Sequence, residues 1–278
     1  MQLHIRHETL YRYGEPVKHS IQNLRLTPRR EPGQRALSWQ IVAPGKRSSQ
    51  VDAHGNVVHL LTLDEPHREI RIVVAGVVET DDGSRHALRD AGPLSPLAYL
   101  SDTALTQASE PIRLFARQFF PAGVERAEAL LTMACAVSDL VTYEPGATEV
   151  TDVAPRVFER RKGVCQDHAH LFIACCRSLG IPARYVSGYL YAGDASRPDF
   201  RGAVASHAWV DAWLGDAAGW MSIDVTNRAV ANGRHCRLAV GRDYLDACPI
   251  RGVRRGGGAE NMRVDVSVKA SAQQQQQQ

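Results

Sequence analysis

Residues 163–171 read Gly-Val-Cys-Gln-Asp-His-Ala-His-Leu and place a cysteine at the start of a predicted helix. The two residues before the cysteine interrupt the preceding helical pattern. Gly180, followed by Pro182, ends the helix at the position that glycine prefers after a C-terminus. Unsatisfied backbone N–H groups at a helix N-terminus favour negative charge and lower the pKa of a thiol there. Cys165 is therefore a candidate nucleophile. The other five cysteines, reduced in a cytosolic chain, are interpreted as small buried hydrophobes.

A cysteine nucleophile needs a base within hydrogen-bond reach and a third group that orients this base. Two segments downstream of the helix alternate as β-strands do, His207–Leu214 and Trp220–Thr226, and a strand is also predicted over Arg184–Tyr191. His207 opens one strand, and Asp224 lies near the end of the next. These two residues are the candidates for the base and for the group that orients it.

The turn between the two strands decides whether these candidates meet. Gly215-Asp216 is a two-residue hairpin signal, and a turn there pairs residues 214 and 217. In that register His207 lies directly opposite Asp224 on one face of the sheet, with Cβ atoms about 5 Å apart. Gly219 offers a second place to turn, which would break this register.

Two other interpretations of these residues stay open. In the first, the thiol, the imidazole and the carboxylate serve packing and capping and never meet. In the second, Cys165, Asp167, His168 and His170 bind a metal. On a helix His168 and His170 point about 200° apart, whereas zinc ligands on one helix need a spacing of three or four residues. We therefore expect no metal and no other cofactor, a packing role for His168, and contacts of Asp167 with backbone or Arg groups near the helix start.

The composition is that of an ordinary soluble globular protein. The chain has 278 residues, enough for about two domains, of which 44% are hydrophobic and 23% charged. Its 33 basic and 30 acidic residues leave a net charge of +3 without a basic block, which argues against nucleic-acid binding. The longest apolar run, residues 72–78, is too short to span a bilayer, and residues 1–13 hold no apolar signal core. We therefore expect no membrane association and a cytoplasmic location.

Two domains and a tail are expected. Period-2 apolar patterns broken by Gly, Pro and Asn clusters predict an antiparallel β domain over residues 1–92, and the catalytic core follows over residues 93–270. Within that core, Arg251–Gly258 is expected to be a solvated basic loop. A last strand is expected to face inward through Met262, Val264, Val266 and Val268. Residues 271–278, which end in six glutamines, are expected to be a flexible tail.

Several ordered blocks carry a family signature. They are the cysteine block, Gly-Ile-Pro-Ala-Arg-Tyr-Val-Ser-Gly-Tyr at 180–189, Ser-His-Ala-Trp-Val at 206–210, Asp-Val-Thr-Asn at 224–227, and flanking segments at 143–148 and 241–244. Together they resemble the transglutaminase-like superfamily of bacterial thiol enzymes, and the N-terminal β region is similar to its bacterial accessory domain. The resemblance implies an α+β fold in which a papain-like core, with the cysteine helix packed on an antiparallel sheet, follows an antiparallel β domain.

The resemblance also implies roles for the candidate residues. Cys165 is the nucleophile, His207 the general base and later the acid, and Asp224 the residue that orients the histidine. Two positions depart from the family pattern, because His168 stands where an aromatic residue is usual and Val225 where a proline is usual. Neither change removes a reacting atom.

The activity implied is amide-bond chemistry through an acyl-enzyme, without a cofactor. A peptidase or amidase acting on peptide or isopeptide bonds, alongside peptide-ligase partner proteins, is favoured over transglutaminase-type transfer from glutamine to an amine. A non-catalytic peptide-binding module is the alternative of another class. The oxyanion is expected near the backbone N–H of Cys165, and Tyr143 and Gln166 are candidates for substrate or oxyanion contacts.

Overall fold

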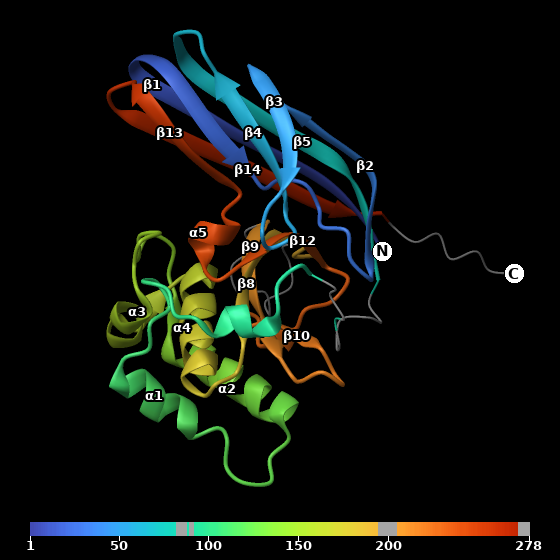
Figure 1. The fold of residues 1–278 in the computed structure, drawn as a ribbon, viewed down its shortest axis with the longest axis vertical. Coiled ribbons are helices and arrows are strands. Elements are labelled where there is room, and N and C mark those ends of the chain that lie inside the picture. The colour runs from blue at the N-terminus through green and yellow to red at the C-terminus, as the bar shows by residue number, and fades with distance from the viewer. Residues whose placement is uncertain (82–87, 89–91, 194–204, 272–278) are drawn as a thin grey trace, which may run out of the picture.

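The computed structural model describes residues 1–81, 88, 92–193 and 205–271. Figure 1 shows a β-sheet layer stacked on a layer of helices and strands, which confirms the predicted α+β class. The predicted joint at residues 82–96 lies largely outside the described residues, and so does the glutamine tail from residue 272 onward. Among the described helices, none is both long enough and apolar enough to cross a membrane.

A 23-residue strand, β1 (Gln2–Leu24), runs through the whole N-terminal sheet. Its side chains alternate between buried and exposed over most of its length, as the period-2 pattern predicts. Its first half pairs with β5 (His67–Thr80) and its second half with β4 (Val57–Leu63). The outer strands β2 (Gln34–Val42) and β3 (Lys46–Val51) extend the sheet, and all of these pairs are antiparallel.

The last two strands return to this N-terminal sheet. β13 (Ile250–Gly256) pairs with the second half of β1, and β14 (Glu260–Ala270) pairs with the first half. The prediction of a basic loop over Arg251–Gly258 is therefore wrong, because most of it is a paired strand and only the glycine end turns. The segment expected to form the second domain, residues 93–270, therefore contains two strands, β13 and β14, that complete the sheet of the N-terminal domain. Sequence periodicity identifies such strands but does not identify their partners.

The inward face of β14 is only half as predicted. Val266 and Val268 pack against the core of the N-terminal sheet. Met262 and Val264, nearer the start of the strand, are 56% and 44% exposed. The sheet therefore extends beyond the surface that covers it.

The second layer is a five-stranded antiparallel sheet with helices on one side. Its order is β11-β10-β9-β8-β12, with β8 (Ala183–Leu190), β9 (Ser206–Trp213), β10 (Trp220–Asp224), β11 (Ala229–Val230) and β12 (His235–Gly241). The cysteine helix α4 (Cys165–Ser178) lies against β8 and β9, as the family resemblance implied. Around it pack α1 (Glu110–Arg117), α2 (Arg126–Leu140) and α3 (Ala154–Arg160). The remaining short elements are η1 (Pro96–Leu100), the parallel pair β6 (Thr142–Tyr143) and β7 (Lys162–Gly163), and α5 (Tyr244–Ala247).

The two sheets share an apolar interface. Tyr189, Cys236 and Leu238, from β8 and β12, belong to the buried cluster that fills the inner face of the N-terminal sheet. The Asn56 side chain adds two hydrogen bonds of 2.8 Å to β12, since its amide donates to the Val240 carbonyl and its oxygen accepts the Val240 N–H. The loop before β4 is thereby fixed against the second sheet.

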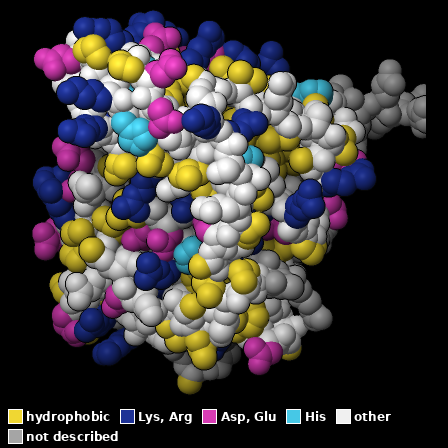
Figure 2. Space-filling view, turned by 45° about the horizontal axis from the view of Figure 1, so that its top comes forward, with side chains coloured by type: hydrophobic (Ala, Val, Ile, Leu, Met, Phe, Trp, Pro, Cys, Tyr) yellow, Lys and Arg dark blue, Asp and Glu magenta, His cyan; other side chains and the backbone are white. Residues whose placement is uncertain are grey.

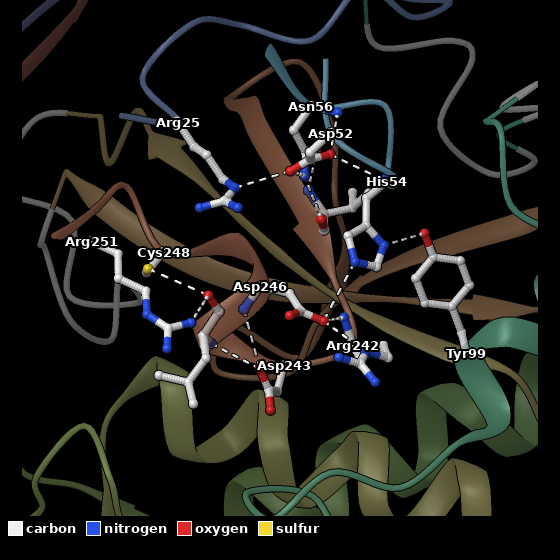
Figure 3. Close-up of polar contacts among 12 residues, drawn as sticks. Arg25, Asp52, His54, Asn56, Tyr99, Arg242, Asp243, Asp246, Cys248 and Arg251 are labelled. Carbon is white, nitrogen blue, oxygen red and sulfur yellow. Dashed lines mark hydrogen bonds and ion pairs between the residues drawn. The ribbon is translucent and has the colours of Figure 1, made fainter. Parts of the chain in front are cut away.

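A polar cluster reinforces this contact on the side of α5. Figure 3 shows His54, from the same loop, between the Tyr99 hydroxyl and the Asp246 carboxylate, at 3.1 and 3.4 Å. Asp246 also accepts a hydrogen bond of 2.8 Å from Arg242. Asp52 holds the loop itself by accepting the N–H groups of His54 and Asn56. These contacts fix α5 to the N-terminal unit.

A chain of buried charges crosses the interface as well. Asp211 on β9 accepts hydrogen bonds from Arg237 and Arg184, and Arg237 reaches Glu31 of the N-terminal unit at 2.7 Å. The Asp211 side chain is fully buried, so its charge depends on both guanidinium groups. On the surface, by contrast, Figure 2 shows lysine and arginine interspersed with acidic and hydrophobic side chains, in keeping with the near-neutral composition.

Candidate active site

Cys165 is the first residue of α4, as the sequence predicts. Val164 before it has extended backbone, and its N–H donates to the Asp167 carboxylate at 2.7 Å. Asp167 also accepts from the Thr148 hydroxyl at 2.6 Å, so its expected contact with backbone near the helix start is confirmed. A Cβ on Gly163 would lie 2.7 Å from Asp167 side-chain atoms, which explains the glycine at this position. Cys165 is a partly exposed residue at the edge of the main helical core.

His207 and Asp224 meet, although the predicted turn between them is wrong. The observed pairs run from Trp213 opposite Trp220 to Val210 opposite Ile223, and the Leu214 N–H donates to the Gly219 carbonyl. The loop is therefore four residues long, and the register is shifted by two residues from the predicted one. Because side chains alternate with a period of two, a shift of two keeps both residues on the predicted face. The His207 Nε2 lies 2.9 Å from the Asp224 Oδ2.

A second imidazole, which the sequence interpretation missed, shares this carboxylate. The His235 Nε2 lies 3.0 Å from the same Asp224 Oδ2, and the side-chain amide of Asn227 donates to it at 2.7 Å. The His235 Nδ1 accepts the Asn232 backbone N–H at 3.1 Å, so the ring proton is on Nε2 and is donated to Asp224. His235 is therefore a neutral donor that holds the carboxylate in place.

The sequence carries only a weak signal for His235. It follows the turn signal Asn-Gly at 232–233 and opens β12, whose seven residues are all buried. A histidine at a fully buried strand end needs a polar partner. Its partner lies on β10, which is not a sheet neighbour of β12, so strand pairing would not have revealed it.

The electrostatics of the group follow from its burial. Burial alone lowers the pKa of His207, but the Asp224 carboxylate and hydrogen bonds to Asp224 and Cys165 outweigh burial and raise that pKa to about 10. Burial opposes the ionisation of Asp224, yet His207 and the hydrogen bonds from both imidazoles hold the pKa of this carboxyl far below its ordinary value. The Trp209 ring contacts both imidazoles and shields them from water. The arrangement stabilises an imidazolium next to the Cys165 sulfur.

The two lesser candidates have different surroundings. The Gln166 side-chain amide donates to the Val150 carbonyl at 3.0 Å and so anchors the loop before α3. Tyr143 lies in β6 opposite Gly163, two residues before Cys165. Burial, together with the nearby charge of Cys165, raises the pKa of Tyr143 to about 12, so its hydroxyl is a neutral donor. An oxyanion role for Tyr143 stays a prediction.

The residues weighed as metal ligands on α4 point apart. The His168 ring is hydrogen-bonded to the Thr226 hydroxyl and the Val141 carbonyl, both at 2.9 Å, which fits the expected packing role. The His170 Nε2 accepts the Tyr244 backbone N–H on the other side of the helix. Among the described residues, His207, Asp224 and His235 bring three possible ligand atoms within 4.8 Å of one another. The Nε2 atoms of His207 and His235 both form hydrogen bonds with the Asp224 Oδ2, so hydrogen bonds account for the closeness of these three residues.

Comparisons with known proteins match both the N-terminal sheet and the second layer to transglutaminase-like families. Residues 3–79 match the family described as the bacterial transglutaminase-like N-terminal region, and residues 115–225 match the transglutaminase-like superfamily. An uncharacterized protein of Mycobacterium tuberculosis is 32% identical over 95% of this chain and 90% of its own length. An uncharacterized protein of Mycobacterium leprae is 31% identical over 96% of this chain and 98% of its own length.

A solved structure shares the fold. It belongs to a candidate cysteine protease from Cytophaga hutchinsonii, with a TM-score of 0.75 and 22% sequence identity. The superposition covers 98% of this chain and 92% of that chain. The likeness therefore extends over both sheets, including the strands that return to the N-terminal sheet.

Proposed function

Since this chain belongs to the transglutaminase-like superfamily, we propose that it is a thiol hydrolase of peptide or isopeptide amide bonds, with Cys165, His207 and Asp224 as its catalytic triad. The observation that carries the proposal is the 2.9 Å hydrogen bond between a buried His207 and a buried Asp224, with the Cys165 thiol close enough to contribute to the raised pKa of the same imidazole. A non-catalytic binding module has no need to keep a carboxylate and an imidazolium buried beside a thiol at the start of a helix.

The first half of the reaction forms the acyl-enzyme. The His207 Nε2 is held by Asp224, so Nδ1 is the nitrogen that takes the thiol proton of Cys165. The thiolate attacks the amide carbonyl carbon, and the negative oxygen forms near the backbone N–H of Cys165 at the N-terminus of α4. Collapse breaks the carbon–nitrogen bond, and the proton on Nδ1 passes to the leaving amine.

The second half releases the acyl group. His207 takes a proton from water, whose oxygen attacks the thioester, and the thiolate leaves as the acid product forms. An amine that replaces water in this step would give the transamidation product instead. We propose hydrolysis because Cys165 is a partly exposed residue and water is far more concentrated than any amine that could reach the same acyl group, and we propose peptide ligases as the partners that make the amides consumed here.

Two measurements test this function. Iodoacetamide alkylation across pH, with the site located by peptide mass spectrometry, should show fast reaction of Cys165 at about pH 6. Cys175 and Cys176 are the internal controls, because burial raises the pKa of both thiols. Equal, slow labelling of every cysteine would refute the triad.

A glutamine-containing peptide, with and without a primary amine, distinguishes the two acceptors. Release of ammonia, or cleavage of the peptide, in the absence of the amine supports hydrolysis. Stable incorporation of the amine into the peptide would show that the enzyme is an acyltransferase instead. A Cys165→Ala variant should abolish either reaction.

A further inference from the structure

A pocket of about 170 Å³ lies between the N-terminal sheet and the catalytic layer. Its N-terminal wall is one face of the β1–β14 ladder, where Tyr11 pairs with Met262 and Thr9 pairs with Val264. Opposite this wall lie Ser206 and Tyr244. We call this space the inter-sheet pocket. It is smaller than the roughly 300–1,000 Å³ of sites that hold a whole drug-sized ligand, so it fits a single side chain.

The inter-sheet pocket lies near the proposed nucleophile. Tyr244, in α5, lines the pocket and contacts the ring of Tyr185, with 6.2 Å between the ring centroids. Tyr185 is fully buried and interacts electrostatically with both Tyr244 and Cys165. The Tyr185 ring therefore connects the wall of the pocket to the surroundings of the thiol.

The chemistry of the inter-sheet pocket favours an uncharged, apolar occupant. Met262 and Val264 present exposed apolar side chains on its wall, where the sheet extends beyond its covered part. The polar residues His7 and Thr9 also line the pocket, and they already have hydrogen-bond partners. His7 is hydrogen-bonded to the Tyr189 hydroxyl at 2.7 Å and to the Thr9 hydroxyl at 2.8 Å. Burial lowers the pKa of His7 to about 4, so this side chain carries no charge at neutral pH.

The elements around the inter-sheet pocket are held rigidly. The contacts of Asp246 with His54 and Arg242 fix α5, and with it Tyr244, to the N-terminal unit (Figure 3). The other wall belongs to the long ladder of β1 and β14. A pocket between fixed elements selects its occupant by size and polarity instead of adapting to it.

We propose that the inter-sheet pocket binds a large apolar side chain of the peptide substrate, next to the amide that Cys165 attacks. This inference rests on the proposed function and gives the N-terminal β domain a role in it, because β1 and β14 supply the specificity wall. Substrates with leucine- or phenylalanine-like side chains at this position are then preferred over those with glycine or acidic residues.

The test uses two reagents that differ only in one apolar group. Alkylation of Cys165 in the full chain is measured at pH 6 with N-benzyl-iodoacetamide and with iodoacetamide, and each rate is divided by that of free glutathione. We expect the benzyl reagent to be favoured by about tenfold, as for an apolar group in a matching pocket. Met262→Asp and Val264→Asp should bring this ratio close to one.

Val42→Asp is the matched control, since Val42 is also a half-exposed valine on the N-terminal sheet but lies on β2. It should keep the wild-type ratio, and thermal unfolding should show all three variants folded. A wild-type ratio near one, or a ratio that both pocket variants leave unchanged, would overturn the inference. If both reagents alkylate Cys165 slowly but the benzyl reagent is still preferred, the proposed function is refuted, whereas the binding of apolar groups by the inter-sheet pocket is supported.

Discussion

Asp224→Asn removes the charge that makes His207 basic and keeps the shape of the side chain. A pKa of about 10, against 6.5 for an ordinary histidine, corresponds to roughly 5 kcal/mol in favour of the imidazolium at 1.36 kcal/mol per pKa unit. Without the carboxylate, burial dominates and lowers that pKa, so His207 is neutral at pH 6 and above. The thiolate of Cys165 then has no cationic partner. An unassisted thiol, with a pKa of about 8.5, is only about 0.3% ionised at pH 6.

Iodoacetamide alkylation of Cys165 between pH 5 and pH 10 measures this effect directly. We expect the variant to react about 100-fold more slowly than the wild type at pH 6, and the two rates to converge by about pH 9 to 10, where any thiol ionises. Amide hydrolysis should fall further, by about 10⁴-fold, as in other triads that lose their carboxylate. A rate deficit of equal size at every pH would mean that Asp224 only supports the local structure and would refute the electrostatic argument.

Three further predictions concern the surroundings of the triad. Asp211→Asn removes the buried carboxylate that Arg184 and Arg237 share, so the free energy of unfolding in urea should fall by about 3–5 kcal/mol; a loss below 1 kcal/mol would contradict a charge-dependent interface. His235→Ala removes a donor from the triad carboxylate and should lower the hydrolysis rate by about tenfold, whereas His235→Gln, which offers an amide N–H in a similar place, should recover most of it; equal losses in both variants would argue against the donor role. The raised pKa of His207 contributes stability that is complete below about pH 6.5 and is lost as the pH rises towards 10, but ionisation of the Cys165 thiol in the folded chain offsets this loss until the thiol of the unfolded chain also ionises, at about pH 8.5. The wild-type unfolding free energy should therefore decline between about pH 8.5 and 10, by up to about 1.4 kcal/mol per pH unit and more steeply than in Asp224→Asn.

Local sequence chemistry predicted where Cys165, His207 and Asp224 lie in their helix and strands better than it predicted the turn that brings the last two together. Cys165 was placed at a helix start by Gly163 and by the apolar stripe after it, both of which are local signals. His207 and Asp224 lie on the same face of the sheet as predicted, although the turn between their strands was predicted incorrectly. A register shift of two residues leaves the alternation of side chains unchanged. A shift of one would have separated them.

The unpredicted features all depend on contacts between distant parts of the chain. His235 meets Asp224 across the sheet, and nothing near it in the sequence marks that partner. The segment 251–258 is basic and rich in glycine, so its composition indicates a loop, yet pairing with β1 makes it a strand. Met262 and Val264 follow the same alternation as the buried Val266 and Val268, and only the extent of the covering layer exposes them.

The pairing of β1 with β14 also constrains how the molecule is made. The first strand to leave the ribosome cannot complete its hydrogen-bond ladder until the last strand has been synthesised, since Leu3 pairs with Ala270 and the Ser271 N–H donates to the Gln2 carbonyl. The strands of the central sheet, β8 to β12, all lie between residues 183 and 241, so this sheet can assemble before the last strand has been made. Because Gln2 and Ser271 lie side by side, a circular permutant that links these two residues and opens the chain at an exposed loop should retain the fold.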